Sequence, residues 1–584
     1  MAEIRNPNAS APGSGGDMRS MLIFTLLALG ALMAFQYFKP PVPPTAAPSA
    51  PTTTRSATSS TAAAFQASSA AATIQAAAET TTVVENDLYR ITFSNRGAQV
   101  KSWILKRYKD SHGRPLDLVN QAAAERFGFP LSLYTYEPQL TAQLNNALYE
   151  PSVTGQVAAP TGIVFRYAAG SLIVTKTFLF NQSYVIDVSV SVEQNGQPVR
   201  ALVAWPSGLG DLEEAAQYNY TKFAYSSDGK RDTTVAKKIS GGATLNQPFD
   251  YAGPIDLYFA ATFLPADPAD ATAVTLRNTL DVPRDTADPK GPKLPEPVLG
   301  AAIGDQNGAT HTRLFAGPLQ YDVLGSIHTT APDGKATGED LRPLVQYGWF
   351  KVIAEPLFLL LRFVHDHMIP NWGWTIIVVT LFFNLLMLPT RFTMMKSSLK
   401  MQRVQPKLDA IKRKYANLKA TDPRRTEMNA ETMKLYKEEG INMYGGCLPL
   451  LVQMPLFFAY YRVLLNSIEL RQASWGWLPN LAAADPLHIL PILIIASMFL
   501  VQFITPSPGM DPAQRRMMAF LMPAIFGFSM WGFASGLALY WATGNLLNIG
   551  LQLGINRSKM GRELHALAVR RAAAKAPRTI NARR

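Results

Sequence analysis

The sequence predicts a membrane protein with six transmembrane α-helices and an antiparallel β-sandwich domain outside the lipid. The first observation is that residues 517–556 contain no Asp, Glu, Lys or Arg. At about 1.5 Å of rise per residue they make roughly 60 Å of helix, about twice the thickness of a hydrocarbon core, so they should cross a bilayer twice. The second is an alternation of apolar and polar residues along 171–192, which is typical of strands.

The distribution of charge is the third observation. The chain has 584 residues and a net charge of +13, and much of the positive excess lies in residues 391–446 and 556–584. Basic runs beside apolar segments indicate cytoplasmic loops and contacts with anionic lipid. Ribosomal RNA or another acidic partner is the alternative. The single cysteine, Cys447, excludes an intrachain disulfide and fits no zinc pattern, and we expect no cofactor.

The N-terminal region predicts a membrane anchor and a tether. Residues 1–20 should be cytoplasmic, and the apolar residues 21–38 should span the membrane. A cleaved signal peptide is the alternative, but Tyr37 and Phe38 are bulky where cleavage needs small residues. Residues 40–82 are almost entirely Pro, Ala, Ser and Thr, so they cannot bury enough apolar surface to fold.

Residues 83–340 predict the β-sandwich, which should be periplasmic. Strands are expected at 171–180 and 184–192, and the Asn195-Gly196 pair after the second suits a tight turn. Frequent Pro and Gly with little helical periodicity favour an antiparallel sandwich. The histidines of this domain are scattered along the sequence, without the spacing of a metal site or a catalytic triad.

Residues 341–370 predict an amphipathic helix that lies in the membrane interface. At 100° per residue four charged side chains fall on one side of the helix, and the opposite side is apolar. The charged set is Lys351, Glu355, Arg362 and Asp366, and the apolar set is Phe350, Ile353, Leu357, Leu360, Leu361 and Val364. His365 and His367 diverge at a spacing of two residues, which disfavours a chelating pair.

Five further spans follow the interfacial helix. They are predicted at 372–390, 448–465, 489–505, 517–533 and 536–555. The basic segment 391–446 should be a cytoplasmic helical hairpin, and the loop 506–516 and the basic tail 556–584 should also be cytoplasmic. The loop 466–488 is then periplasmic, and both termini lie in the cytoplasm.

Polar side chains recur within these spans. Asn384 follows Thr380 on the first of the five, Gln453 and Gln502 lie on the next two, and the last carries several amides. A side-chain amide inside a membrane either bridges helices or faces water. Several spans with polar groups toward the cytoplasmic side favour a hydrated recess that opens on that side, and simple bridging is the alternative. Arg391 lies close to the face of Asn384 and could reach back toward it.

These segments resemble the YidC family of bacterial inner-membrane protein insertases. The resemblance covers nearly the whole chain and is most specific in NWGWTIIVVT (371–380), INMYGGCLPLLVQMPLFFAYY (441–461) and SGLALYW-x3-N (535–545). It implies five core helices around a hydrophilic groove that is open to the cytoplasm and to lipid. It also implies a periplasmic β-supersandwich similar to sugar mutarotases.

The candidates for groove residues come from the polar and aromatic side chains of the predicted spans. The candidates are Thr380, Asn384, Gln453, Gln502, Tyr540 and Trp541. Members of this family usually place an arginine in the groove on the first core helix, and Asn384 occupies that position here. Arg391 is therefore the candidate for a substitute groove cation.

The function implied is that of a membrane insertase and chaperone, not an enzyme. It would insert integral membrane proteins into the bacterial inner membrane and help them fold and assemble, alone or with the Sec translocon. Nascent membrane proteins, the ribosome, the signal-recognition particle receptor and anionic lipids are the expected partners. The recruitment surfaces would be the hairpin and the tail, through Lys407, Lys412, Arg413, Lys414, Arg570 and Arg571.

Two other classes of function remain as alternatives. A secondary transporter of a small solute is disfavoured because the spans carry no Asp, Glu or Lys for ion coupling. A membrane-anchored, carbohydrate-active periplasmic domain would need carboxylates and histidines clustered in one cleft.

Overall fold

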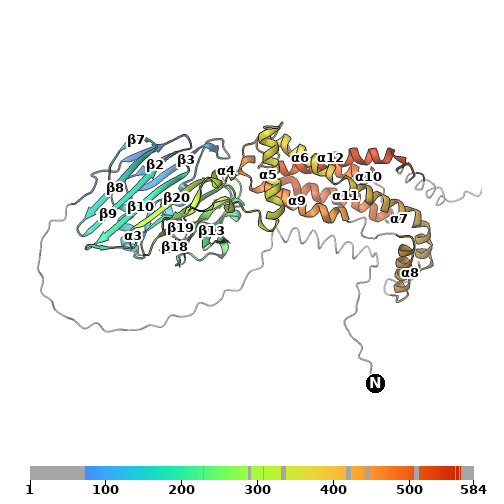
Figure 1. The fold of residues 1–584 in the computed structure, drawn as a ribbon, viewed down its shortest axis with the longest axis horizontal. Coiled ribbons are helices and arrows are strands. Elements are labelled where there is room, and N and C mark those ends of the chain that lie inside the picture. Colours follow the sequence, from blue (N-terminus) through green and yellow to red (C-terminus); the bar gives the residue numbers. More distant parts are fainter. Residues whose placement is uncertain are drawn as a thin grey trace, which may run out of the picture. The chain divides into compact units, whose positions relative to one another are not determined.

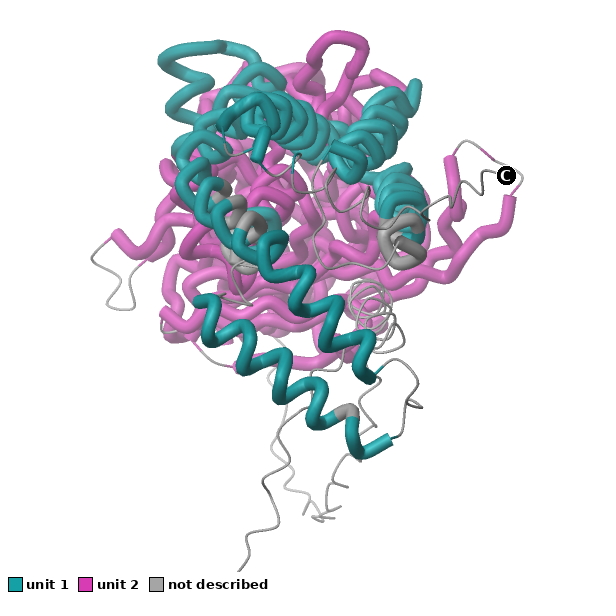
Figure 2. Tube along the Cα trace, turned by 90° about the vertical axis from the view of Figure 1, so that its right-hand side faces the viewer, with its two compact units in different colours: residues 1–67, 360–458, 483–584 teal, residues 68–359, 459–482 magenta. Residues whose placement is uncertain are grey.

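The computed structural model describes residues 73–559, 561–563 and 566, except for 228, 247, 287, 289–290, 307, 331–336, 416–421, 441–447 and 505–511. The predicted anchor at 21–38, most of the predicted tether, and Arg570 and Arg571 lie outside the described residues. The chain divides into two compact units, shown in different colours in Figure 2. We call residues 68–359 and 459–482 the β unit, and residues 1–67, 360–458 and 483–584 the helical unit.

Three larger sheets build the β unit (Figure 1). The ten-stranded sheet has the order β14-β13-β16-β17-β20-β10-β9-β8-β6, and β11 pairs with β10. Its strands are β6 (Glu150–Pro151), β8 (Thr161–Ala169), β9 (Leu172–Phe180), β10 (Val185–Gln194), β11 (Gln197–Pro198), β13 (Lys222–Ser227), β14 (Lys230–Val235), β16 (Tyr251–Ile255), β17 (Phe259–Pro265) and β20 (Thr310–Pro318).

Two five-stranded sheets complete the layers. The first, in the order β4-β3-β2-β1-β7, contains β1 (Thr81–Glu85), β2 (Tyr89–Ser94), β3 (Gln99–Lys109), β4 (Pro115–Asp117) and β7 (Gly155–Ala158). The second, in the order β15-β18-β19-β12-β5, contains β5 (Ser132–Tyr134), β12 (Leu202–Trp205), β15 (Ala243–Leu245), β18 (Ala271–Pro283) and β19 (Lys293–Asp305). One apolar core unites all three sheets, for example through Phe93, Phe178 and Trp205.

Short elements fill the connections of the β unit. They are α2 (Gln121–Phe127), α3 (Pro138–Asn146), η1 (Gln217–Tyr220), η2 (Ala236–Lys238), α4 (Tyr321–Gly325), the pair β21 (His328–Thr330) and β22 (Thr337–Asp340), η3 (Arg342–Leu344), η4 (Gly348–Phe350) and η6 (Ile468–Leu470).

The predicted strands at 171–180 and 184–192 are present as β9 and β10. Every second residue of β9 is buried, as the alternation indicates. Asn195 and Gly196 have φ angles of 56° and 70°, the left-handed region that a tight hairpin turn requires of both central residues. The expectation of a purely antiparallel domain is wrong at one place, because β1 and β7 pair in parallel. Their connection runs through other strands, so no tight turn forces an antiparallel arrangement.

A buried lysine lies inside this core. Lys176 on β9 is fully buried, and its Nζ donates to the carbonyl oxygens of Gly97 at 2.8 Å, Ala98 at 3.1 Å and Leu131 at 2.7 Å. Ala98 and Leu131 both have positive φ, so their carbonyls belong to tight turns. Burial lowers the pKa of Lys176 to about 7. The three carbonyls match the three N–H groups of the ammonium form.

Gly253 of β16 lies where the neighbouring strand β17 leaves no room for a side chain. A Cβ atom there would lie 2.2 Å from the carbonyl oxygen of Ala261 and 2.7 Å from the Cα of Thr262, both backbone atoms of β17. We expect Gly253→Ala to lower the free energy of unfolding by roughly 2–3 kcal/mol, because the strands must separate. Gly162→Ala is the matched control, since a Cβ there meets first the flexible tip of Leu179. Equal urea midpoints for the two variants of the full chain would contradict this.

The helical unit contains helices in the ranges of the predicted spans and of the predicted hairpin. They are α6 (Trp372–Leu386), α7 (Leu388–Lys414), α8 (Arg425–Glu438), α10 (Ile489–Ile504), α11 (Pro512–Ser529), η7 (Met530–Gly532) and α12 (Ser535–Arg557). Two further helices, α5 (Lys351–His367) and α9 (Leu448–Asn466), have residues in both units. Within the helical unit α12 packs on α6 and α10, and α10 packs on α11. No helix of the described ranges is at once long and apolar enough to cross a membrane, so the six crossings stay a prediction.

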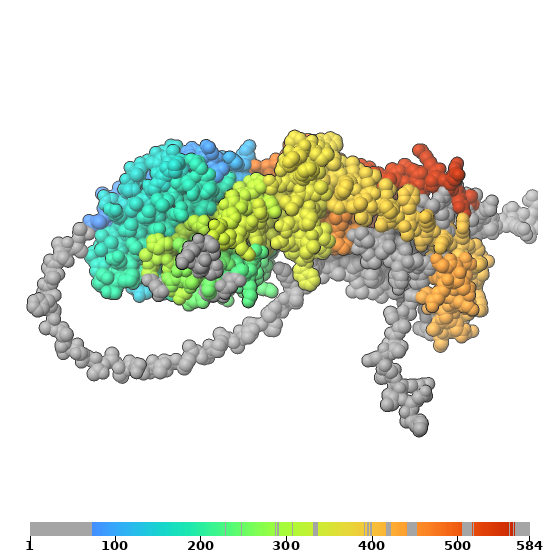
Figure 3. Space-filling view, viewed as in Figure 1, coloured from blue at the N-terminus to red at the C-terminus, as the bar shows by residue number. Residues whose placement is uncertain are grey.

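Helix α5 begins at Lys351, later than the predicted start at 341, and half of its predicted apolar residues are buried. Leu357, Leu361 and Val364 are buried within the protein. The charged side forms ion pairs at i and i+4, Lys351 with Glu355 and Arg362 with Asp366. Other apolar side chains are exposed on or just before α5 (yellow in Figure 3), namely Trp349, Val352, Leu359 and Phe363.

The predicted single span at 372–390 is also wrong in one respect. Helix α6 ends at Leu386, and α7 begins at Leu388 with Pro389 in its first turn. Proline is favoured there because it lacks the N–H that would be unpaired in any case. The hairpin helices α7 and α8 share a small apolar cluster of Val404, Leu408 and Leu435. Helix α8 begins at Arg425.

Candidate functional site

Helix α12 carries polar side chains that contact two other helices of the helical unit. Gln453 of α9 donates from Nε2 to the hydroxyl oxygen of Tyr540 at 3.1 Å. Asn545 of α12 donates from Nδ2 to the hydroxyl oxygen of Ser497 on α10 at 3.0 Å. These bonds bridge helices, which is what apolar surroundings demand of amide and hydroxyl groups. Gln453 and Asn545 remain half-buried, whereas Tyr540 is buried.

Asn384 lies on α6 beside the same helix. Its Nδ2 donates to the carbonyl of Thr380 at 2.9 Å, one turn earlier. A Cβ atom at Gly544 of α12 would lie 3.9 Å from that nitrogen, which places the amide beside α12. The amide is half-buried. Asn384 therefore presents a polar group next to α12.

Thr380 does not have the place that we expected for a groove residue. It is fully buried, and its hydroxyl donates to the carbonyl of Ile376 at 2.6 Å. A threonine in an apolar helix satisfies its hydroxyl in this way when no other acceptor is near. Its contribution is to accept the bond from Asn384, and it lines no exposed surface.

Trp541 and Gln502 complete the set of groove candidates. Trp541 packs edge-on against Phe457 of α9, with ring centroids 5.0 Å apart, and contacts Phe526 of α11 at 5.7 Å. Gln502 is half-buried on α10 and takes no part in the polar contacts described above. The structure thus brings Asn384, Gln453, Tyr540 and Trp541 to one helix and its neighbours.

The candidate groove cation, Arg391, lies on a different helix from Asn384. Arg391 lies in the first turn of α7, but its side chain is outside the described residues. Because α6 and α7 are separate helices, the seven-residue spacing from Asn384 no longer places both on one helical face.

The predicted recruitment residues of the hairpin fall into two groups. Lys407 pairs with Glu439 and Lys414 with Glu431, each at 2.5 Å, and these hydrogen bonds raise the pKa of both lysines. These ion pairs join α7 to the second half of the hairpin. Lys412 and Arg413 lie between them and are exposed.

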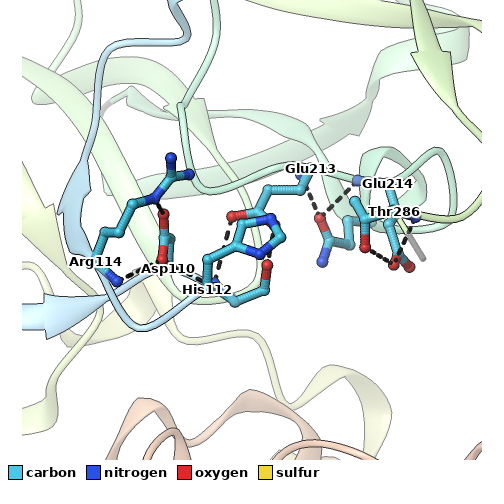
Figure 4. A network of polar contacts seen from close by, with 8 residues as sticks. Asp110, His112, Arg114, Glu213, Glu214 and Thr286 are labelled. Atoms are coloured by element: carbon cyan, nitrogen blue, oxygen red, sulfur yellow. Dashed lines mark hydrogen bonds and ion pairs between the residues drawn. The ribbon is translucent and has the colours of Figure 1, made fainter. Parts of the chain in front are cut away.

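A polar network in the β unit was not foreseen from the sequence. Asp110 accepts from the Arg114 guanidinium at 2.8 Å, the Nε2 of His112 lies 3.9 Å from Glu213 Oε2, and Thr286 donates to Glu214 at 2.8 Å (Figure 4). These residues come from three loops that are far apart in sequence. Among the described residues no group of three or more His, Cys, Asp or Glu could hold a metal ion. The network ties the loops together.

Comparison with known proteins gives the class of protein, an inner-membrane protein with a periplasmic domain. The YidC periplasmic domain matches residues 81–360, and the 60Kd inner membrane protein family matches residues 363–563. The chain belongs to the family of the membrane protein insertase YidC. The boundary between the two matches falls within α5.

Individual relatives cover most of the chain. The membrane protein insertase YidC of Geobacter sulfurreducens is 32% identical over 484 residues, which are 80% of this chain and 85% of the relative. That of Ralstonia nicotianae is 32% identical over 491 residues, 82% of this chain and 84% of the relative. A crystal structure of an active YidC insertase with the first transmembrane domain resolved is 18% identical, with a TM-score of 0.33, and covers 81% of this chain and 94% of that structure.

Proposed function

We propose that the polar contacts along α12 are where a substrate polypeptide meets this membrane protein insertase. As a member of the family the protein is an inner-membrane insertase with a periplasmic domain, and it is not an enzyme. The observation that carries the proposal is that Asn384, Gln453 and Tyr540 gather on or beside one helix. An apolar bundle that only anchors a domain does not need polar groups there.

Gln453 and Tyr540 exchange their mutual hydrogen bond, and Asn384 its bond to the Thr380 carbonyl, for bonds to the substrate. The polar flank of a nascent membrane protein would otherwise lose water without compensation, at a cost of several kcal/mol per charge. Groups from Asn384, Gln453, Gln502 and Tyr540 lower that cost, and Trp541 contacts apolar segments. Arg391 is the candidate cation for acidic flanks. Apolar substrate residues then move into lipid, and their burial drives release.

The proposed topology has six crossings, formed by residues 21–38 and by α6, α9, α10, α11 and α12. Both termini and the α7–α8 hairpin lie in the cytoplasm, and the β unit lies in the periplasm. The basic hairpin, with Lys412 and Arg413 exposed between the paired lysines, and the tail with Arg570 and Arg571 receive the ribosome and the signal-recognition particle receptor. The Sec translocon is a further partner. Exposed Trp349, Val352 and Phe363 contact the interface of anionic membranes.

A site-specific crosslinking experiment tests the site. A photo-crosslinker replaces Asn384 in the full-length protein while ribosomes translate a small phage coat protein. We expect capture of the nascent chain from position 384. The matched control is position 382, where Phe382 on the same helix is exposed. Capture from 382 but not from 384 would refute the site.

Reconstitution in liposomes distinguishes an insertase from a transporter of small solutes. The purified protein in liposomes should stimulate insertion of the same coat protein, with no flux of small solutes. Solute flux without stimulated insertion would favour the transporter alternative.

A further inference from the structure

Residues 467–472, directly after α9, are built into the β unit. Ile468 is buried in the apolar core that unites the three sheets. The backbone N–H of Tyr321 donates to Glu469 Oε1 at 3.4 Å, and Gln472 Nε2 donates to the carbonyl of Lys109 at 3.0 Å. The sequence predicts only a periplasmic loop at 466–488, and the structure docks these residues of it in the β unit. We call residues 467–472 the docked segment.

Arg471 of the docked segment forms a buried ion pair. Its Nη1 lies 3.0 Å from Asp211 Oδ2, and the two side chains are only 13% and 4% exposed. The guanidinium also lies over the rings of Tyr258 and Phe259, with its central carbon 5.2 and 5.1 Å from their centroids. A buried ion pair of this kind is sensitive to any loss of charge balance, because neither charge has water to replace its partner.

A second buried carboxyl group, that of Asp256, changes the charge balance around this ion pair. Asp256 accepts from the backbone N–H groups of Tyr258 at 2.7 Å and Phe259 at 2.8 Å, both through Oδ1. Its Oδ2 and the Oδ1 of Asp211 are buried and have no hydrogen-bond partner among the described residues. Asp256 and Asp211 are within hydrogen-bonding reach of each other, so with both carboxylates ionised the one guanidinium of Arg471 would leave a negative charge uncompensated.

We propose that Asp256 carries a proton and donates it from Oδ2 to Asp211 Oδ1, so that Arg471, Asp211 and Asp256 form a neutral, proton-linked latch that holds the docked segment in the β unit. One proton satisfies both orphan oxygens and balances the charge. Burial raises the pKa of Asp256 well above its usual range, and the neighbouring Asp211 raises it further.

The other titratable groups around the latch do not change this assignment. The groups that face Arg471, Asp211 or Asp256 from neighbouring elements are Tyr108, Tyr218, Tyr220, Tyr258 and Glu469. Burial raises the pKa of each of these four tyrosines, so they stay neutral as Asp256 titrates. Glu469 adds a negative charge, which favours the protonated form of a nearby carboxyl group.

The direction of the pH effect follows from the proton count. The docked state binds the Asp256 proton above the ordinary pKa of an aspartate, and the undocked state releases it. The latch is therefore complete at low pH, and it weakens as the pH rises through the raised pKa of Asp256. This inference rests on the geometry of the β unit alone and not on the proposed substrate site.

Hydrogen exchange of the full-length protein in nanodiscs measures how firmly the docked segment is held in the β unit. Peptides that cover residues 467–472 report docking, and peptides of β9 and β10 report the integrity of the sheet in the same sample. We expect Asp256→Asn to keep the docked segment protected, because an amide N–H replaces the shared proton and Oδ1 still accepts. Asp211→Asn should speed its exchange by roughly a hundredfold, because Arg471 loses its carboxylate. Glu85→Gln, at an exposed ion pair, is the matched control.

The pH dependence of hydrogen exchange tests whether the Asp256 proton holds the docked segment. After correction for intrinsic exchange, protection of the docked segment should fall with rising pH in the unmodified protein and stay level in Asp256→Asn. The proposal is overturned if Asp256→Asn loosens the segment as much as Asp211→Asn while β9 and β10 stay protected. It is equally overturned if the unmodified protein shows no pH dependence.

Discussion

Replacing Lys176 by methionine is expected to lower the free energy of unfolding of the β unit by about 3–5 kcal/mol. The ammonium group holds the carbonyls of Gly97, Ala98 and Leu131, and methionine offers no donor to any of them. Each buried carbonyl that loses its partner costs roughly 1–3 kcal/mol, and the backbone cannot turn away because it lies in a packed core. Methionine has nearly the same length as lysine, so a cavity contributes little.

The measurement is urea unfolding of the full-length protein in micelles, followed by hydrogen exchange of β9 and β10. Lys230→Met is the control, because Lys230 is exposed on the edge strand β14 and a surface change of this kind stays within about 0.5 kcal/mol. Similar midpoints for Lys176→Met and Lys230→Met would mean that the carbonyls find other donors. A Lys176→Ala variant should lose more than Lys176→Met, because it adds a cavity to the same loss of hydrogen bonds.

Replacing Asn384 by leucine is expected to slow insertion of a substrate with a charged translocated flank by at least about tenfold. The amide is a half-buried polar group on α6, beside the bare backbone of Gly544. Leucine removes a donor and an acceptor from the path, and one charge that crosses without such partners costs about 2.5–3.5 kcal/mol. A substrate with an uncharged flank should lose much less, because its passage needs fewer polar partners.

The insertion assay uses proteoliposomes with both substrates. Asn384→Gln keeps the amide and should retain most of the activity, whereas Phe382→Leu alters an exposed neighbour and should change neither substrate. Equal losses for charged and uncharged substrates in Asn384→Leu would argue for a packing defect. Unchanged insertion of both would remove Asn384 from the substrate site.

Local patterns were enough to predict several elements correctly. The alternation of β9 and β10 and the Asn195-Gly196 turn are visible in the sequence, because strand burial has a period of two and only a few residue types accept positive φ. The ends of α9, α10 and α12 lie within two residues of the predicted spans, because long apolar runs end where polar residues begin. The break between α6 and α7 was missed, since a proline permits a new helix without dictating one.

The candidate site was predictable in residue type but not in pairing. Asn384, Gln453 and Tyr540 were chosen because polar groups in apolar helices are costly, and that argument is local. The sequence does not say that Gln453 would bond Tyr540 or that Thr380 would turn its hydroxyl to its own helix. Those outcomes depend on how the helices are rotated against each other.

The sequence by itself determined the two-part plan of this protein, a strand-rich part followed by apolar helices with polar residues inside, because burial and solvent leave periodic traces along a chain. Only the tertiary structure decided that Lys176 donates hydrogen bonds to the backbone carbonyls of Gly97 and Leu131. It also decided that Arg471 forms an ion pair with Asp211, 260 positions away. Such partners are chosen by sheet register and chain path, and these place residues together without leaving a local pattern in either segment.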